Sequence, residues 1–446
     1  MKIEFVAHAS VVLRRDPVHL LCDPWLAGTA FDDGWALLAD PVFGTEDFAT
    51  VTHLWFSHEH PDHFSPRTLA MIPEPVRQQI TVLFHESLDR KVALHCEKLG
   101  FGRVVELPSG QWQTLAEGFE LKCETWEGSD DSWLLVRTPE GTVLNLNDCQ
   151  ANSQAQVDAL HAKTGDVDVL LTQFSISAWA GNAEDQARRE AGAVTMLERT
   201  VRQTRTLKAK HVIPFASFVW FCHEENFYMN SAMRPVGDAA AWIAGQTEAQ
   251  PVVLYPGDRW ALGSVHDSEL AIKRYAADLA GIGERQRYHG TTIDIASLMT
   301  AAERFSQRVI GDRSALRVRL SAVKLNAAYQ LRRHSRRRLW GRLRALMEIA
   351  LLRIRPARIW LTDHKRSFDY CLLRHMEPAG YSREDCDVEM SSEALLFAFR
   401  FLWGGETLMI NGRFREVAED GSRQLFEYLG IACEMNKGAG ALARPL

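Results

Sequence analysis

The chain has 446 residues, of which 46% are hydrophobic and 24% charged, and its formal net charge is -6 at pH 7. These values are ordinary for a globular protein, and the length indicates two or three domains. The negative net charge argues against general binding to nucleic acid, and no apolar run is long enough to predict a membrane span.

The cysteines and the first residues indicate the compartment in which the protein works. The eight cysteines are scattered along the chain without paired spacing, which suits free thiols in a reducing environment. The first residues read as a strand and lack the apolar stretch and cleavage site of a signal peptide. We therefore expect a cytoplasmic protein.

Residues 1–265 alternate strands and helices, as is typical of a layered α/β domain. Turn residues at 139–141 and 256–258 interrupt this pattern. Helices are expected near residues 88–99 and over residues 185–208. We expect two sheets between layers of helices. The predicted strands cover residues 3–6, 10–13, 19–22, 51–56, 80–84, 103–106, 119–125, 132–137, 142–145, 167–172, 211–214 and 252–255.

The sequence changes character near residue 266. Residues 266–356 are expected to form a helical, strongly charged connecting region, and residues 332–344 hold seven arginines around Trp340. Such a stretch is most often a solvated helix face. It would also fit an acidic partner, a phosphate-bearing substrate or peripheral contact with an anionic membrane.

Residues 357–446 are expected to form a small α+β accessory domain. Strands are predicted at 359–362, 368–374 and 388–391, a helix at 392–401, and a turn at Gly404-Gly405. The segment resembles the sterol-carrier-protein fold, whose members hold apolar ligands. A structural or dimerisation domain is the alternative.

The most informative string in the chain is H-E-H-P-D-H at residues 58–63. So many polar groups need partners and cannot form an apolar buried element. Alternate side chains of an extended segment share a side, so His58 and His60 can bind one cation. The chain then turns at the proline, so Asp62 and His63 can bind a second cation.

This string resembles the H-x-H-x-D-H signature of the metallo-β-lactamase superfamily. Residues 6–28 are similar to the opening hairpin of its ascorbate-phosphate-lactonase-like branch. Residues 141–150 resemble the strand whose final aspartate bridges two metals, and residues 211–230 the segment with the last histidine. Over about residues 1–260 the chain is most similar to the C-terminal part of the CMP-N-acetylneuraminate hydroxylase family. The resemblance implies an αββα sandwich.

The resemblance also implies a site for two divalent metal ions. The implied ligands are His58 and His60 for the first ion, Asp62, His63 and His223 for the second, and Asp148 as a bridge. Glu225 is an alternative to His223. His8 and Asp23 would orient the ligands from behind. Asp62 and Asp148 are expected to be the catalytic residues, since a carboxylate at such a site can orient a water or move a proton.

One departure from the family pattern bears on the metal. Hydrolytic members place a third histidine of the first ion in a turn that here contains no histidine. Counting back from the following strand puts Glu127 nearest to that position, with Asp130 and Asp131 as alternatives. A carboxylate makes the site harder and more anionic, which favours iron or manganese over zinc.

Three functions are consistent with the sequence. The first is a non-haem iron hydroxylase, with one or two irons, acting on a small molecule such as a nucleotide sugar or glycoconjugate. Because no cysteine is followed by histidine as a Rieske cluster requires, it would need a separate Rieske or ferredoxin electron donor. The second is a zinc- or manganese-dependent hydrolase of a phosphate ester, lactone or amide. The third is a lipid- or partner-binding protein with a residual metal site.

Overall fold

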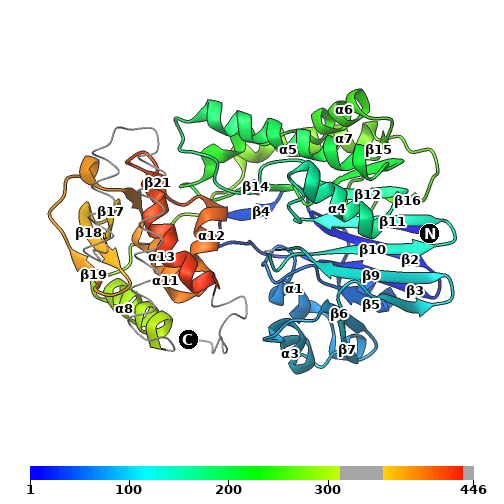
Figure 1. Ribbon diagram of the computed structural model, residues 1–446, viewed down its shortest axis with the longest axis horizontal. Helices are drawn as coiled ribbons and strands as arrows, with labels where there is room; N and C mark the ends of the chain where they lie inside the picture. The colour runs from blue at the N-terminus through cyan, green and yellow to red at the C-terminus, as the bar shows by residue number, and fades with distance from the viewer. Residues whose placement is uncertain (128, 312–354, 435–446) are drawn as a thin grey trace. The chain divides into compact units, whose positions relative to one another are not determined.

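The protein is described here from a computed structural model, which covers residues 1–127, 129–311 and 355–434 (Figure 1). The chain divides into two compact units. The first unit comprises residues 1–222 and 227–287, and the second unit comprises residues 223–226 and 288–446. The domain boundaries predicted from the sequence, after residues 265 and 356, remain predictions.

The first sheet of the first unit has seven strands in the order β16-β1-β2-β3-β5-β6-β7. Short turns join β1, β2 and β3, so these strands are antiparallel, whereas longer connections make β3, β5, β6 and β7 parallel. The strands are β1 (Lys2–Ala7), β2 (Ser10–Arg15), β3 (Val18–Cys22), β5 (His53–Trp55), β6 (Thr81–His85), β7 (Arg103–Leu107) and β16 (Arg259–Ala261).

The second sheet also has seven strands, in the order β15-β13-β12-β11-β10-β9-β8. Strands β8 to β11 form an antiparallel meander, and β11, β12, β13 and β15 are parallel. The strands are β8 (Trp112–Ala116), β9 (Phe119–Thr125), β10 (Ser132–Thr138), β11 (Gly141–Asn147), β12 (Val169–Gln173), β13 (His211–Phe215) and β15 (Gln250–Pro251). A separate ribbon pairs β4 (Trp35–Leu37) with β14 (Val219–Phe221).

Both sheets are apolar on both faces, because each lies between its partner sheet and a layer of helices (Figure 1). Val11 of β2 and Leu134 of β10 belong to the buried cluster between the sheets. The next residue, Val12, points the other way and shares a cluster with Leu69 of α1, while Leu135 belongs to the cluster under α4. The helices are α1 (Pro66–Met71), α2 (Glu74–Arg77), α3 (Lys91–Lys98), α4 (Gln154–Thr164), α5 (Gln186–Thr206), α6 (Val236–Gln246) and α7 (Glu269–Ala280). The predicted αββα sandwich is confirmed.

The strand expected at residues 252–255 is not formed. The ladder of β15 ends at Pro251, and the buried residues that follow have irregular backbone. The Val252 N–H still donates to the Val212 carbonyl of β13 (2.8 Å). Beyond it the Val253 N–H donates to Ser268 Oγ (3.0 Å) and the Tyr255 N–H to Asp258 Oδ2 (2.9 Å), so the ladder does not continue. An apolar run predicts burial here but not sheet pairing.

The second unit, described by itself, packs helices on a five-stranded sheet of order β19-β18-β17-β20-β21. Its basic stretch at residues 332–344 lies outside the described residues. An α+β domain at the C-terminal end is confirmed. The elements are α8 (Ile295–Gly311), β17 (Ala357–Leu361), β18 (Arg366–Cys371), β19 (His375–Pro378), β20 (Val388–Met390), α11 (Ser392–Arg400), α12 (Gly404–Asn411), β21 (Arg415–Glu416) and α13 (Ser422–Glu434).

The turn expected at Gly404-Gly405 is instead the start of α12. These glycines serve close packing. A Cβ atom at Gly404 would lie 2.6 Å from the Ala398 Cα, and one at Gly405 would lie 2.5 Å from the Leu429 Cβ. The pair therefore lets α12 approach α11 and α13 closely, which a side chain at either position would prevent.

A buried arginine organises the polar part of the second unit. Arg413 is 1% exposed. Its Nε donates to Glu225 Oε2 (2.7 Å) and its Nη2 to Glu393 Oε2 (2.8 Å), while Thr291 Oγ1 donates to Glu393 Oε1 (2.8 Å). The Asn226 side chain also donates to the Asn411 carbonyl (2.7 Å). Residues 223–226 are thus held by residues that lie far along the chain.

The Glu393 carboxylate should make the second unit sensitive to acid. Burial raises its pKa, but Arg413 and Thr291 outweigh burial and hold the pKa below its ordinary value of 4.5. A carboxyl group with a lowered pKa stabilises the fold above its unfolded-state pKa and loses that effect as the pH falls. We expect E393Q to lower the melting temperature at pH 7, with the difference from wild type shrinking below pH 4.5. The exposed E303Q on α8 serves as the control. A difference that is constant across this range would contradict the ion pair.

Candidate metal centre

The loop after β5 has a fixed backbone. The N–H groups of His63 and Phe64 both donate to the His60 carbonyl (3.0 and 2.7 Å), which closes a turn at the proline. Ser65 then caps α1 by accepting from the Thr68 N–H (3.2 Å). Because the strands β3, β5 and β6 are parallel, this loop lies at the edge of the sheet where their carboxyl ends meet.

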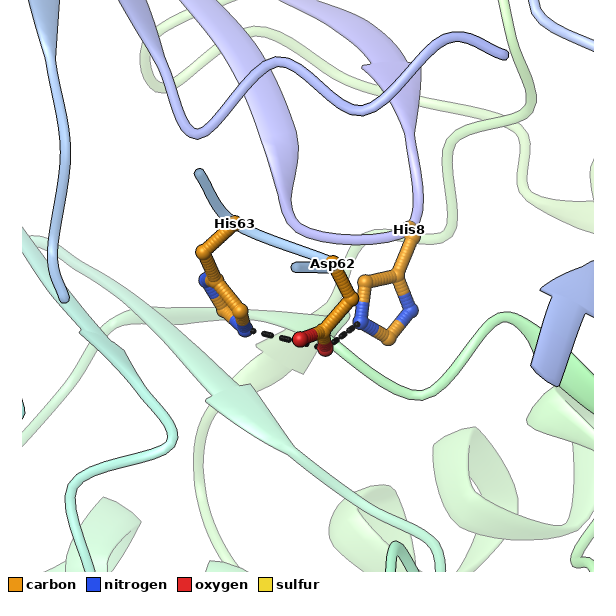
Figure 2. Close-up of side chains that lie close together, drawn as sticks. All are labelled: His8, Asp62 and His63. Atoms are coloured by element: carbon orange, nitrogen blue, oxygen red, sulfur yellow. Dashed lines mark hydrogen bonds and ion pairs between the residues drawn. The ribbon is translucent and has the colours of Figure 1, made fainter. Parts of the chain in front are cut away.

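One cluster of possible ligands contains His8, Asp62 and His63, and all three side chains are buried. Figure 2 shows the Asp62 carboxylate between the two imidazole rings. Its Oδ2 lies 3.2 Å from His8 Nε2 and 3.3 Å from His63 Nε2. His8 comes from the turn between β1 and β2. The sequence assigned it a supporting role, but its nitrogen lies among the potential ligand atoms.

Asp23 holds His63 from the opposite side of the ring. Its Oδ2 lies 3.0 Å from His63 Nδ1, and its Oδ1 accepts the Ser57 N–H at 2.7 Å. A carboxylate on one ring nitrogen fixes the tautomer and leaves the other nitrogen for a cation. In His63 that second nitrogen is the Nε2 that faces Asp62.

A second cluster contains His58, His60 and Asp148, whose potential ligand atoms lie within 4.8 Å of one another. His58 Nε2 is 2.9 Å from His60 Nδ1. Asp148 Oδ2 is 3.5 Å from His63 Nε2, so this carboxylate also reaches the first cluster. The structure therefore brings together six side chains from three separate stretches of sequence.

Two residues with left-handed backbone help to aim these carboxylates. Asp23 has a φ of 42° and Asn147, directly before Asp148, has a φ of 37°. Residues other than glycine rarely adopt this region, and such strain is concentrated at functional sites. The Asn147 side chain compensates by donating to the Ser132 carbonyl (2.9 Å) and accepting the Asp148 N–H (2.6 Å).

The turn that lacks a histidine presents Asp131 to His58. Asp131 is 9% exposed, and its Oδ1 lies 3.8 Å from His58 Nε2, whereas Glu127 is exposed. The Trp126 N–H donates to the Asp131 carbonyl (2.6 Å), which tightens the turn and carries Asp131 inward. Asp130 lies in the same turn, and neither it nor Asp131 belongs to the two clusters found among the described residues. Counting residues back from the strand treats the turn as extended, so it did not predict that Asp131 lies closer to His58 than Glu127 does.

The electrostatic balance of the site favours a cation. Burial alone would lower the pKa of His63, but Asp62, Asp148 and Asp23 raise it well above its ordinary value. Burial would raise the pKa of Asp62, but His63 and His8 lower it. Moreover, Asp62 Oδ1 is buried and accepts no hydrogen bond from any described residue, which is costly unless a cation or water satisfies it. The donor set fits bound metal.

His223 belongs to the second unit. Its ring is buried, its backbone N–H donates to Asn226 Oδ1 (3.1 Å), and its Nδ1 accepts the Glu225 N–H (3.2 Å). Glu225 is engaged by Arg413, so it is a weaker competitor for a cation than His223. The role of His223 as a ligand remains a prediction.

Sequence reasoning missed Gln173, which contacts a carboxylate of the site. Gln173, at the end of β12, donates from Nε2 to Asp148 Oδ1 at 2.6 Å. The signal available in the sequence was a glutamine that ends an otherwise apolar strand. His85 is buried at the end of β6, and burial lowers its pKa to about 4.

In the part of the chain that the structure describes, no helix is both long enough and apolar enough to cross a bilayer.

No family model matches the chain. The chain is 26% identical over 215 residues to a Mycolicibacterium smegmatis protein whose name describes a Rieske 2Fe-2S iron-sulfur protein; the match covers 46% of this chain and 40% of that protein. It is 25% identical over 247 residues to the Danio rerio cytidine monophosphate-N-acetylneuraminic acid hydroxylase, covering 51% of this chain and 40% of the relative.

Among solved structures, the E377D mutant of the CmlA beta-hydroxylase aligns with a TM-score of 0.41 and 18% identity, over 58% of this chain and 54% of that chain. This chain covers less than half of the length of the two sequence relatives. Both ligand clusters consist of side chains that can hold a metal ion. The two sheets between layers of helices form an αββα sandwich, and over about half of its length the chain is similar to cytidine monophosphate-N-acetylneuraminic acid hydroxylases.

Proposed function

We propose that the protein is a non-haem iron hydroxylase that acts on a small molecule and receives electrons from a separate protein. The observation that carries this proposal is the approach of Asp131 to His58, at 3.8 Å. A carboxylate beside the two histidines makes the donor set hard, and hard oxygen ligands favour iron or manganese over zinc.

The proposed ligands are divided between two ions. His58, His60 and Asp131 would hold the first ion, Asp62 and His63 would hold the second, and Asp148 would lie between them. Iron bound in this way would supply the activation of O2. The chain's own residues orient the ligands: Asp23 fixes the ring of His63, and Ser132 Oγ donates to the Ser57 carbonyl (2.6 Å), tying the Asp131 turn to the histidine loop.

The electron donor and the substrate are proposed from the relatives. None of the eight cysteines is followed by histidine at the spacing of a Rieske cluster, while the name of one relative describes a Rieske protein. A separate Rieske or ferredoxin protein would therefore supply electrons. The hydroxylase relatives make a nucleotide sugar or another glycoconjugate the first substrate class to test.

The proposal predicts which metal the protein contains. Protein purified without added metal should contain iron at one or two equivalents per chain, measured by elemental analysis. It should consume O2 when a chemical reductant or reduced ferredoxin is supplied with a nucleotide sugar. Stoichiometric zinc together with hydrolysis of a phosphate ester, lactone or amide would establish the hydrolase alternative instead. Protein without any tightly bound metal would favour a binding protein with a residual site.

Matched substitutions test the ligand set. H60A should weaken binding of the first ion by more than about 100-fold, since loss of a ligand should exceed the loss caused by an outer-shell partner. D131A should also lower the iron content, and D131H should shift the preference toward zinc. E127A and E127H change the exposed residue of the same turn and should leave the metal content as in wild type. The opposite pattern would return the third-ligand role to Glu127.

A further inference from the structure

Arg199 is a buried cation that has no ion-pair partner among the residues that the structure describes. It lies on α5 with 5% exposure. Among the residues that the structure describes, no carboxylate oxygen comes within 4.0 Å of its guanidinium, and its Nε makes no hydrogen bond. An isolated buried charge is strongly unfavourable, so an arginine in this position requires a compensating anion nearby.

The compensating anion is reached through Gln173. Arg199 Nη2 donates to Gln173 Oε1 (3.1 Å), and Gln173 Nε2 donates to Asp148 Oδ1 (2.6 Å). Gln173 is 3% exposed, and its backbone carbonyl accepts from Thr200 Oγ1 (2.9 Å). The chain of contacts therefore runs from a buried cation, through one amide, to the carboxylate of the proposed metal site.

The direction of each hydrogen bond between Arg199, Gln173 and Asp148 follows from which groups can donate and which can accept. Guanidinium only donates, so the amide oxygen of Gln173 must face Arg199. Its NH2 group then faces Asp148, which as a carboxylate only accepts. The flipped amide would place its oxygen against Asp148 and its NH2 group against the guanidinium, so both neighbours select the same orientation.

We propose that Gln173 and Arg199 are positioning residues: Gln173, held by Arg199, engages Oδ1 of Asp148 and so directs Oδ2 toward the metal ions. Oδ2 is the oxygen that lies 3.5 Å from His63 Nε2. The positive charge of Arg199 also attracts the Asp148 carboxylate. This inference rests on the metal site of the proposed function, but it holds for whichever divalent ion the site binds.

Cobalt binding provides the test, because Co2+ reports both affinity and ligand geometry through its visible absorption. The full chain is stripped of metal and titrated with Co2+. Q173L should weaken Co2+ binding by roughly 10- to 100-fold, the range expected for the loss of an outer-shell partner, and should alter the absorption spectrum. R199M should act in the same direction. Because Arg199 acts through Gln173, the double variant should be no weaker than Q173L alone.

Gln203 supplies a matched control on the same helix. It is buried, accepts from Thr172 Oγ1 (2.7 Å) and donates to the Ala151 carbonyl (3.3 Å), and among the described residues it has no hydrogen bond to Asp148. Q203L removes a comparable buried amide and should lower the thermal stability without changing Co2+ affinity or spectrum. If Q173L and Q203L have the same effect on Co2+ binding, the role of Gln173 is merely structural.

Each result decides between specific claims. Folded Q173L and R199M that bind Co2+ as wild type does, with the same spectrum, overturn this inference alone, as do additive losses in the double variant. Wild type that binds no Co2+ overturns the ligand assignment and this inference with it. Wild type that binds Co2+ and shows the predicted variant effects, yet contains zinc and hydrolyses esters, overturns only the hydroxylase proposal.

Discussion

The centre depends on the need to neutralise carboxylates that the fold buries close together. Asp23 and Asp62 are fully buried and Asp148 is partly buried, and all three face the same imidazole of His63. Two like charges about 4 Å apart repel by about 4 kcal/mol at an effective dielectric constant of 20. A proton on His63 or a bound cation can balance this charge, so proton and metal are alternative occupants of the same electrostatic site.

The fold concentrates these groups through strand direction. The histidine loop follows β5, Asp23 follows β3, and Asp148 follows β11, each at the end of a strand with a parallel neighbour. Parallel strands present their carboxyl ends at one edge, so residues distant in sequence meet there. The apolar faces of both sheets then exclude water from behind the site, which strengthens each polar contact within it.

Much of this arrangement is readable from the sequence, and the limits have physical causes. The loop at 58–63 is local, so alternation and one proline are enough to predict its two pairs of side chains. Asp131 was not preferred because a tight turn reorders side chains that counting treats as evenly spaced. The contact from Gln173 to Asp148 joins β12 to the end of β11, and no local pattern carries information on such pairing. Gly404 and Gly405 were misread because close helix packing and a turn both select glycine.

The short segment 223–226 makes the second unit depend on residues from the middle of the chain. The chain leaves the first unit at residue 222 and returns to it at residue 227, after four residues whose partners include Asn411 and Arg413. During synthesis those four residues emerge almost two hundred positions before their partners do. Their final conformation must therefore wait until the C-terminal part of the chain has been made, and a protein truncated before residue 411 would lack the contacts that shape them.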